Sequence, residues 1–200
     1  MKLIFATNNR HKVEEMQAAI GNAFKLITLQ EAGINIDIPE PHDTLEANAT
    51  EKSQTIYRLT GIDCFSEDTG LETEALHGEP GVNSARYAGD GKSPEKNMEK
   101  LLSNLEGQAN RRARFRTVIS LILDGKEHLF EGICKGVIET APRGSGGFGY
   151  DPVFTPDGDT RTFGEMSLAE KSRYSHRQRA ASQLVLFLQR PATSGRESLI

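Results

Sequence analysis

At the start of the chain, residues 2–12 read KLIFATNNRHK, a run in which four successive apolar residues give way to hydroxyl, amide and basic side chains. Residues 2–6 are typical of a short buried strand. Apolar residues then recur at helical spacing over residues 13–20, which predicts a helix that begins within residues 9–12. The chain is therefore expected to turn from strand to helix at residues 7–9.

The same alternation of strand and helix continues beyond this junction. A second strand is predicted near residues 24–29, followed by a helix that opens with a capping box at Asp43 and Glu46 and ends at Gly61. A third, short strand is predicted over residues 64–66. The acidic pair Glu67-Asp68 is then expected to follow the end of that strand.

The second half of the chain predicts a helix and a hairpin. Ser93-Pro94 is typical of a helix N-terminus. Two strand-like runs, residues 114–123 and 128–139, are joined by Asp124-Gly125, a dipeptide that favours a two-residue turn. The sheet is therefore expected to be mixed.

Two further capping boxes, at Ser167 with Glu170 and at Ser175 with Gln178, predict helices near the end of the chain. Alternating strands and helices indicate an α/β fold class. We expect one domain over residues 1–190 and a flexible tail over residues 191–200, which have no apolar periodicity.

The composition excludes several protein classes. With 36% hydrophobic and 26% charged residues in a chain of 200, collagen, coiled coil and disordered chain are excluded. The longest apolar runs are far shorter than the roughly 20 residues of a membrane-spanning helix, and no secretory segment is evident, so a cytoplasmic protein is expected. Cys64 and Cys134 lack metal-site spacing and are expected to be buried, reduced thiols. A net charge of −4 argues against bulk nucleic-acid binding.

The strand-to-helix junction at residues 7–12 is a candidate phosphate site. The first N–H groups of a helix have no partners within the helix and carry partial positive charge, so they bind anions. Lys12 would add a full positive charge. The alternative is that Thr7 or an asparagine merely caps the helix.

The acidic pair Glu67-Asp68 is a candidate metal site. Hard divalent cations prefer oxygen ligands, and one of two carboxylates could also orient or deprotonate a water. Glu40, between two prolines, is a candidate third ligand. The alternative is that these acids only form a solvent-facing turn.

The glycine-rich residues 144–149 match the letters of a dinucleotide-binding motif, but Pro152 follows where a helix should open, so that reading is rejected. Phe148 and Tyr150 among glycines nevertheless suit base stacking. An ordinary mobile loop is the alternative. Residues 175–177, Ser-His-Arg, would add donors at another helix N-terminus.

Residues 111–116 form a basic run interrupted by Phe115, a pattern that can bind nucleic acid. If Phe115 faces the core, however, Arg114 and Arg116 simply face water from a strand. The second interpretation is favoured.

Taken together, five segments (residues 6–12, 66–71, 80–87, 146–152 and 170–177) resemble, in order, the motifs of the inosine/xanthosine triphosphate pyrophosphatase family. The resemblance extends from about residue 2 to residue 189. It implies an elongated α/β fold whose mixed central sheet and flanking helices form two lobes around a substrate cleft. It also implies a homodimer that uses Mg²⁺ to hydrolyse ITP, dITP and XTP to the monophosphate and pyrophosphate, which prevents their incorporation into DNA and RNA.

The same resemblance implies roles for particular residues. Asp68 matches the catalytic carboxylate and a metal ligand, with Glu40 and Glu67 at acidic metal-site positions. The implied substrate-binding residues are Thr7, Asn8, Asn9, Arg10, His11, Lys12, Lys52, Thr69, Arg86, Phe148, Gly149, Tyr150, Asp151, Lys171, His176 and Arg177. Asn8 stands where the family often has glycine, Glu67 where many members have aspartate, and Ala47 at a frequent glutamate position.

Two other functions remain open at this point. The basic run would suit a non-catalytic nucleotide-binding or RNA-binding module, which would bind without turnover and lose affinity steeply with salt. Alternatively, the same enzyme class could act on modified pyrimidine or ordinary purine triphosphates, which competition kinetics would reveal.

Overall fold

The computed structural model describes residues 1–190, so the tail expected over residues 191–200 lies outside the described residues. Strands and helices alternate along the chain as the sequence predicts. In order they are β1 (Lys2–Phe5), α1 (Arg10–Ile20), β2 (Lys25–Thr28), α2 (Leu45–Thr60), β3 (Cys64–Thr73), β4 (Pro80–Gly81), α3 (Pro94–Asn104), β5 (Arg112–Leu123), β6 (Lys126–Ile138), β7 (Phe154–Pro156), α4 (Leu168–Ser172) and α5 (His176–Leu188).

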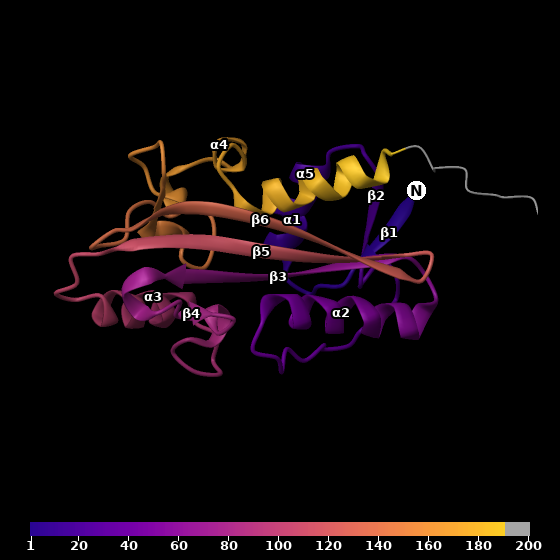
Figure 1. Cartoon of the computed structure of the whole chain (residues 1–200), viewed down its shortest axis with the longest axis horizontal. Helices are drawn as coiled ribbons and strands as arrows, with labels where there is room; N and C mark the ends of the chain where they lie inside the picture. The colour runs from indigo at the N-terminus through magenta and orange to yellow at the C-terminus, as the bar shows by residue number, and fades with distance from the viewer. Residues whose placement is uncertain (191–200) are drawn as a thin grey trace, which may run out of the picture.

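The strands form one mixed sheet in the order β2-β1-β3-β5-β6-β7, with β4 paired to β3. β1 is parallel to β2 and β3, whereas the β3–β5, β5–β6 and β6–β7 pairs are antiparallel. The long strands β3, β5 and β6 run the length of the molecule, with α5 on one side and α2 and α3 on the other (Figure 1). The expected α/β class and mixed sheet are confirmed.

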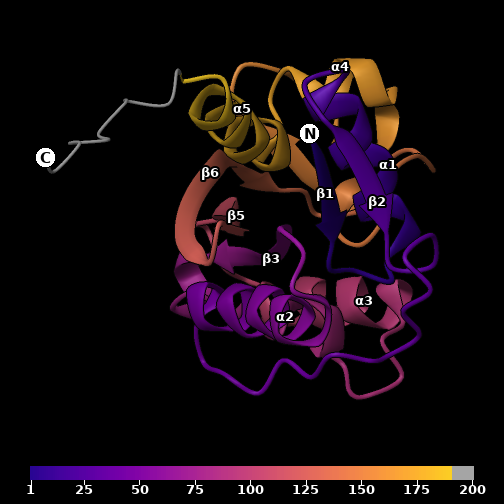
Figure 2. The ribbon, with the colours of Figure 1, turned by 90° about the vertical axis from the view of Figure 1, so that its right-hand side faces the viewer.

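The first lobe packs around β1. Alternate side chains of a strand point to opposite faces of its sheet. Leu3 and Phe5 accordingly join the core beneath α1 and α5, whereas Ile4 joins the core against Ile56 of α2. Figure 2, seen along the long strands, shows α5 and α2 on opposite sides of the curled sheet.

The second lobe lies at the other end of the long strands. Its core gathers Leu101 of α3, Phe115 of β5 and Phe154 of β7. The rings of Phe115 and Phe154 meet edge to face with centroids 4.7 Å apart, a favoured aromatic geometry. The two lobes thus share one sheet and have separate cores.

The strand that carries the acidic pair is longer than predicted. β3 does not end at residue 66 but continues to Thr73, because it pairs with β5 from Cys64 through Thr73. Acidic residues and glycine are depleted in strands, so the local sequence favours a stop that tertiary pairing overrides. Since the side-chain period is two residues, Glu67 and Asp68 point to opposite faces of the sheet rather than together into one cleft.

Two predicted capping boxes differ in detail. Thr44, not Asp43, caps α2 by accepting a hydrogen bond from the Ala47 N–H. Ser175 caps α5 as predicted, but the Gln178 side chain donates to the Ala19 carbonyl of α1 instead of closing the box. At α5 a contact made by the folded chain thus takes the Gln178 side chain that the local pattern would use.

The other local signals are confirmed. Gly61 ends α2 in the left-handed conformation, and the positive φ angles of Asp124 and Gly125 form the hairpin turn. Cys64 and Cys134 are free and buried, and burial raises the pKa of each thiol to about 12. Within residues 1–190 no helix is long and apolar enough to cross a membrane.

Candidate active site

A cavity of about 520 Å³ opens where β3 lacks a neighbouring strand. On this edge β3 pairs with β1 only at Cys64 and Phe65, and with β4 only at Leu71 and Glu72. The segment between these pairings supplies Asp68 and Thr69 to the cavity wall. The starts of α1, α3 and α5 and the glycine-rich loop before β7 supply much of the remaining wall.

Most of the predicted site residues meet in this cavity. Those that line it are Asn9, His11, Lys12, Glu40, Asp68, Thr69, Phe148, Gly149, Tyr150, Asp151, Lys171, His176 and Arg177. Six predicted residues do not line it, namely Thr7, Asn8, Arg10, Lys52, Glu67 and Arg86. Segments spread over 170 residues of sequence are thus brought to one place.

The strand-to-helix junction is held by its own polar side chains. Asn9 caps α1 by accepting from the Lys12 N–H at 3.2 Å, as the capping interpretation predicted, and Thr7 accepts from the Asn9 N–H at 3.2 Å. Asn8 donates to the Ile36 carbonyl at 2.9 Å and so ties the junction to the segment before α2. Arg10 is exposed and pairs with Glu14. Only part of the predicted phosphate loop therefore faces the cavity.

Asp68 lies on the α2 face of the sheet. Its Oδ1 is 3.2 Å from Nζ of Lys52, and Lys52 also forms a short ion pair with Glu40. Burial raises the pKa of Asp68 above its ordinary value, although the charges of Lys52 and Lys12 oppose this. Burial would also raise the pKa of Glu40, but the adjacent Lys52 lowers it. Lys52 thus joins two carboxylates that differ in acidity.

Glu67 lies on the opposite face, against α5. Both of its carboxylate oxygens accept from Arg177, at 2.7 and 2.8 Å, and Lys12 lies 3.3 Å away. Burial would raise the pKa of Glu67, but Arg177 and Lys12 lower it to about 2. Glu67 therefore serves as a buried anchor for two cations.

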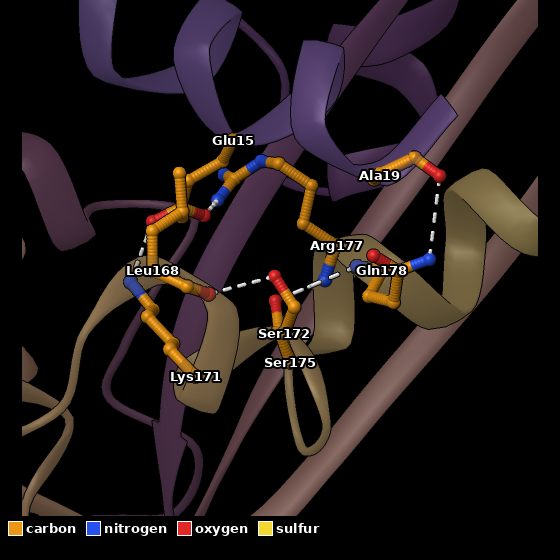
Figure 3. Close-up of a pocket in the computed structure, with 8 residues that line it drawn as sticks. All are labelled: Glu15, Ala19, Leu168, Lys171, Ser172, Ser175, Arg177 and Gln178. Atoms are coloured by element: carbon orange, nitrogen blue, oxygen red, sulfur yellow. Dashed lines mark hydrogen bonds and ion pairs between the residues drawn. The ribbon is translucent and has the colours of Figure 1, made fainter. Parts of the chain in front are cut away.

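Glu15 of α1 belongs to the same charge cluster and was not predicted from the sequence. It lies between the side chains of Lys171 and Arg177 and forms ion pairs with both (Figure 3). Lys171 also pairs with Asp151 at 2.6 Å. A signal was present, since Glu15 lies one turn after Lys12 on the same helix face.

The charges around the cavity are nearly balanced. Four cations, Lys12, Lys52, Lys171 and Arg177, form ion pairs with the carboxylates Glu15, Glu40, Glu67, Asp68 and Asp151. Lys92 and Glu95 add one charge of each sign to the cavity lining. Carboxylates therefore outnumber cations by one. These cations alone do not neutralise a triphosphate of about four negative charges.

The three acids predicted as metal ligands do not lie together in the structure. Among residues 1–190 there is no group of three or more histidine, cysteine, aspartate or glutamate side chains arranged to hold a metal ion. Glu40 and Asp68 both face the cavity and both form ion pairs with Lys52, whereas Glu67 forms an ion pair with Arg177 on the other face of the sheet. Mg²⁺ is usually bound through one or two carboxylates together with substrate phosphates, so the Glu40–Asp68 pair fits this ion.

Aromatic rings form the other side of the cavity. Phe148 stacks on His11 with centroids 5.2 Å apart, and Lys171 lies 5.1 Å from the centre of the same ring. Phe115 stacks on His176 at 4.7 Å. These flat apolar faces suit a nucleobase.

His176 is buried and uncharged. Burial, together with the nearby Arg177 and Lys171 charges, lowers the pKa of His176 well below its ordinary value. Its Nδ1 atom has no hydrogen-bond partner within the described part of the chain. A neutral imidazole with a free polar atom is thus placed beside the cavity.

The glycine-rich loop is a tight turn around Asp151. The Asp151 carboxylate accepts from the Phe148 N–H at 2.8 Å and also pairs with Lys171. Gly147 has a φ of 70°, and a Cβ atom there would lie 2.1 Å from the Asp151 carboxylate. Glycine is therefore needed at this position for both conformation and space.

Arg86 and the arginines of the basic run do not line the cavity. Arg86 donates to the Glu40 carbonyl at 3.1 Å, so it holds the Glu40 segment from the second lobe. Arg114 pairs with Glu72, and Arg116 pairs with Glu46 and Glu131, while Phe115 is buried. Phe115 faces the core and Arg114 faces water, as the surface-strand interpretation predicts, whereas Arg116 is mostly buried among its acidic partners. The paired arginines give no support to an RNA-binding surface.

Sequence reasoning also missed the wall contributed by the second lobe. Val82, Lys92, Asn97 and Met98 line the cavity, and none was a predicted site residue. Met98 also belongs to the face of α3 that packs against the core of the second lobe. A residue at the edge of such a face can serve both the core and a cavity, and a helical pattern does not distinguish the two.

The chain resembles known proteins over nearly its whole length. The model of the Ham1 family matches residues 3–187. A protein of Porphyromonas gingivalis named dITP/XTP pyrophosphatase is 49% identical over 188 residues, covering 94% of this chain and 97% of the relative. A protein of the same name from Flavobacterium johnsoniae is 46% identical over 185 residues, covering 92% and 96%.

Solved structures agree in fold. The Ham1 protein of Staphylococcus aureus matches with a TM-score of 0.85 and 36% identity, covering 94% of this chain and 98% of that one. A HAM1 protein from Coxiella burnetii matches with a TM-score of 0.86 and 34% identity over the same shares. The elongated two-lobed α/β arrangement is thus shared with both structures.

Proposed function

This chain belongs to the Ham1 family, and we propose that it hydrolyses the non-canonical purine nucleoside triphosphates ITP, dITP and XTP to the monophosphate and pyrophosphate. Such a reaction prevents the incorporation of these nucleotides into DNA and RNA. One observation carries the proposal. A single cavity combines a capped helix start, buried cations, a carboxylate pair and stacked aromatic rings.

The two sides of the cavity suggest where the substrate lies. The triphosphate is proposed to lie against the start of α1 and Lys12. The base is proposed to lie among Phe148, Tyr150 and the ring of His176. The substrate then spans both lobes, and Asp68 lies on the wall between its two ends.

Mg²⁺ is the proposed cofactor, held by Glu40 and Asp68. The near-balance of charge around the cavity supports a metal, because the four cations are already paired with five carboxylates. When bound, Mg²⁺ would neutralise phosphate charge and polarise the phosphoryl group under attack. Glu67 has no ligand role in this proposal, since Arg177 occupies both of its oxygens.

Asp68 is the proposed catalytic residue. It would orient the attacking water and accept its proton as the bond between the α- and β-phosphates breaks. Asp68 is buried and faces the cavity. Lys52 holds one of its oxygens at 3.2 Å and so limits rotation of the carboxylate.

Hydrogen-bond complementarity would select the base. Hypoxanthine and xanthine present a 6-keto oxygen, which accepts hydrogen bonds, whereas the 6-amino group of adenine donates them. A side-chain or backbone N–H of His176 or Arg177 would donate a hydrogen bond to the 6-keto oxygen. A donor facing the adenine amino group would leave both groups buried without partners, which rejects an analogue strongly.

The decisive test is an assay of both phosphate products. Purified protein with Mg²⁺ is incubated with equal concentrations of inosine, deoxyinosine, xanthosine, adenosine and guanosine triphosphates, and pyrophosphate and orthophosphate are measured separately. We expect pyrophosphate from the first three alone and its loss when a chelator removes the metal. Orthophosphate as the product, equal rates with all five substrates, or no product would contradict the proposal.

The assembly of the protein is a separate proposal. The family resemblance implies a homodimer, so sedimentation equilibrium is expected to give about twice the 22.0 kDa mass of one chain. A monomer mass at micromolar concentration would contradict this expectation. The absence of a stable nucleic-acid partner and the cytoplasmic location stay predictions.

A further inference from the structure

Asn48 contacts the catalytic carboxylate and has no role in the proposal above. It lies on α2 one turn before Lys52 and is completely buried. Its Nδ2 atom is 3.3 Å from Oδ2 of Asp68. A fully buried amide on the wall behind Asp68 requires an explanation, because asparagine is rarely buried without a specific partner.

The backbone of His42 fixes which end of the Asn48 amide faces Asp68. The His42 N–H donates to Oδ1 of Asn48 at 2.9 Å, and Nδ2 donates to the His42 carbonyl at 3.1 Å. A flipped amide would set donor against donor and acceptor against acceptor. The second N–H of the amide is thereby directed at Asp68 as a donor.

Asp68 is consequently held at both oxygens by one helix. Lys52 donates to Oδ1 at 3.2 Å, and Asn48 donates to Oδ2 at 3.3 Å. Two donors on α2, one at each oxygen, define the plane of the carboxylate. The two hydrogen bonds between Asn48 and the His42 backbone also fix the segment that contains Glu40, which lies two residues before His42.

We propose that Asn48 is a positioning residue for hydrolysis, which orients the Asp68 carboxylate and fixes the Glu40 segment beside it. This inference rests on the proposed function. Asn48 acts through Asp68 and Glu40 and does not line the cavity itself. Its removal should slow the chemical step more than it weakens substrate binding.

Other contacts attach α2 to the sheet, so Asn48 is not needed for docking. Ser53 and Ser120 share a hydrogen bond of 2.7 Å, and Thr50 donates to Glu127 at 2.6 Å. Ser66 of β3 donates to the Ala49 carbonyl at 2.5 Å. Ser53 is therefore a matched control, since it is as buried as Asn48, lies on the same helix and has no contact with Asp68.

The test compares Asn48→Ala with Ser53→Ala. For dITP hydrolysis with Mg²⁺, we expect kcat of Asn48→Ala to fall about 10- to 100-fold, because a small misplacement of reacting groups is costly. KM should change less than about threefold. The Kd of a dITP analogue with a methylene group between the α- and β-phosphorus atoms, measured without catalysis, should change equally little. Ser53→Ala should keep kcat within about twofold.

A second variant keeps the inference testable if Asn48→Ala does not fold. Asn48→Asp keeps the shape and the acceptor for the His42 N–H but has no N–H for Asp68, so kcat should fall at least as far. Unfolding midpoints show whether each variant is folded. The inference would be overturned if either folded Asn48 variant had the kcat of the unmodified protein, or if kcat fell equally in Asn48→Ala and Ser53→Ala. The proposed function would stand in either case. No pyrophosphate release by the unmodified chain would overturn both.

Discussion

At the scale of single residues, the neighbouring acids Glu67 and Asp68 have different partners and different acidities. Glu67 lies on the α5 face and is held by Arg177, while Asp68 lies on the α2 face and is held by Lys52. Burial raises the pKa of Asp68, whereas the pKa of Glu67 is lowered to about 2 because the cations around it outweigh its burial. Two adjacent carboxylates with such different environments are suited to different tasks.

Asp68→Asn tests the catalytic task. The amide keeps the size of the side chain but removes the negative charge and the proton acceptor. We expect turnover of dITP to fall by orders of magnitude while the circular dichroism spectrum and the unfolding midpoint stay close to those of the unmodified protein. Near-normal turnover in this variant would exclude Asp68 as the catalytic carboxylate.

Glu67→Gln tests the structural task through its pH dependence. The pKa of Glu67 is about 2 in the folded chain against 4.5 ordinarily, because Arg177 and Lys12 overcome its burial. Its carboxylate therefore stabilises the fold fully above about pH 4.5 and loses this contribution as pH falls toward 2. The variant should be less stable by about 3 kcal/mol at pH 7, since a buried pair is broken, and the difference should shrink in acid.

Urea unfolding at pH 7 and near pH 3 measures that difference. Glu14→Gln is the matched control, because Glu14 pairs with Arg10 at the exposed surface, where ion pairs contribute at most about 1 kcal/mol. The structural role of Glu67 would be contradicted if the free energies of unfolding of the unmodified protein and Glu67→Gln differed little at pH 7. A difference that grows in acid would contradict it as well.

At the scale of elements, the close contact between β6 and α5 places the start of α5 at the cavity. A Cβ atom on Gly132 would lie 2.0 Å from the His176 carbonyl oxygen and 2.5 Å from the Ala180 nitrogen. These are backbone atoms, which cannot move aside as the end of a flexible side chain can. Gly132 thus permits the approach that brings His176 and Arg177 to the site.

Gly132→Ala is expected to push α5 away from β6. We expect a loss of about 1–3 kcal/mol in the free energy of unfolding from overpacking. We also expect a fall in kcat/KM for dITP, because His176 and Arg177 move with the helix. Gly91→Ala is the control, since a Cβ atom at Gly91 would meet nothing within 4 Å. Equal, small effects of the two changes would refute the idea that this contact sets the helix position.

At the scale of the whole molecule, one side chain of the second lobe reaches a catalytic segment of the first. Arg86, which follows β4, donates to the Glu40 carbonyl at 3.1 Å. Glu40 in turn pairs with Lys52 and faces the cavity. The relative placement of the two lobes is thereby linked to the carboxylate pair.

Arg86→Ala should weaken this link and lower kcat/KM for dITP about tenfold, the effect of losing one charge-assisted hydrogen bond. Arg114→Ala is the control, because Arg114 pairs with Glu72 and does not line the cavity. Steady-state kinetics of both variants provide the measurement. An Arg86→Ala enzyme as efficient as Arg114→Ala would show that the contact is dispensable.

The sequence by itself determined the features that depend on neighbours along the chain. The α/β class, the helix starts at Asn9 and Ser93 and the turn at Asp124-Gly125 follow from periodicity and from capping and turn chemistry. Most of the predicted site residues likewise line the cavity, because their motifs keep a recognisable order along the chain.

The tertiary structure alone decided how those residues are used. β5 extends β3 through Glu67 and Asp68 and so sends the two acids to opposite faces. The packing of α1 brings Glu15 to Arg177, and the packing of α2 brings Asn48 to Asp68. The physical reason is that burying a charge or an amide requires a partner within hydrogen-bond distance. That distance is set by strand pairing and helix packing, which local sequence patterns do not encode.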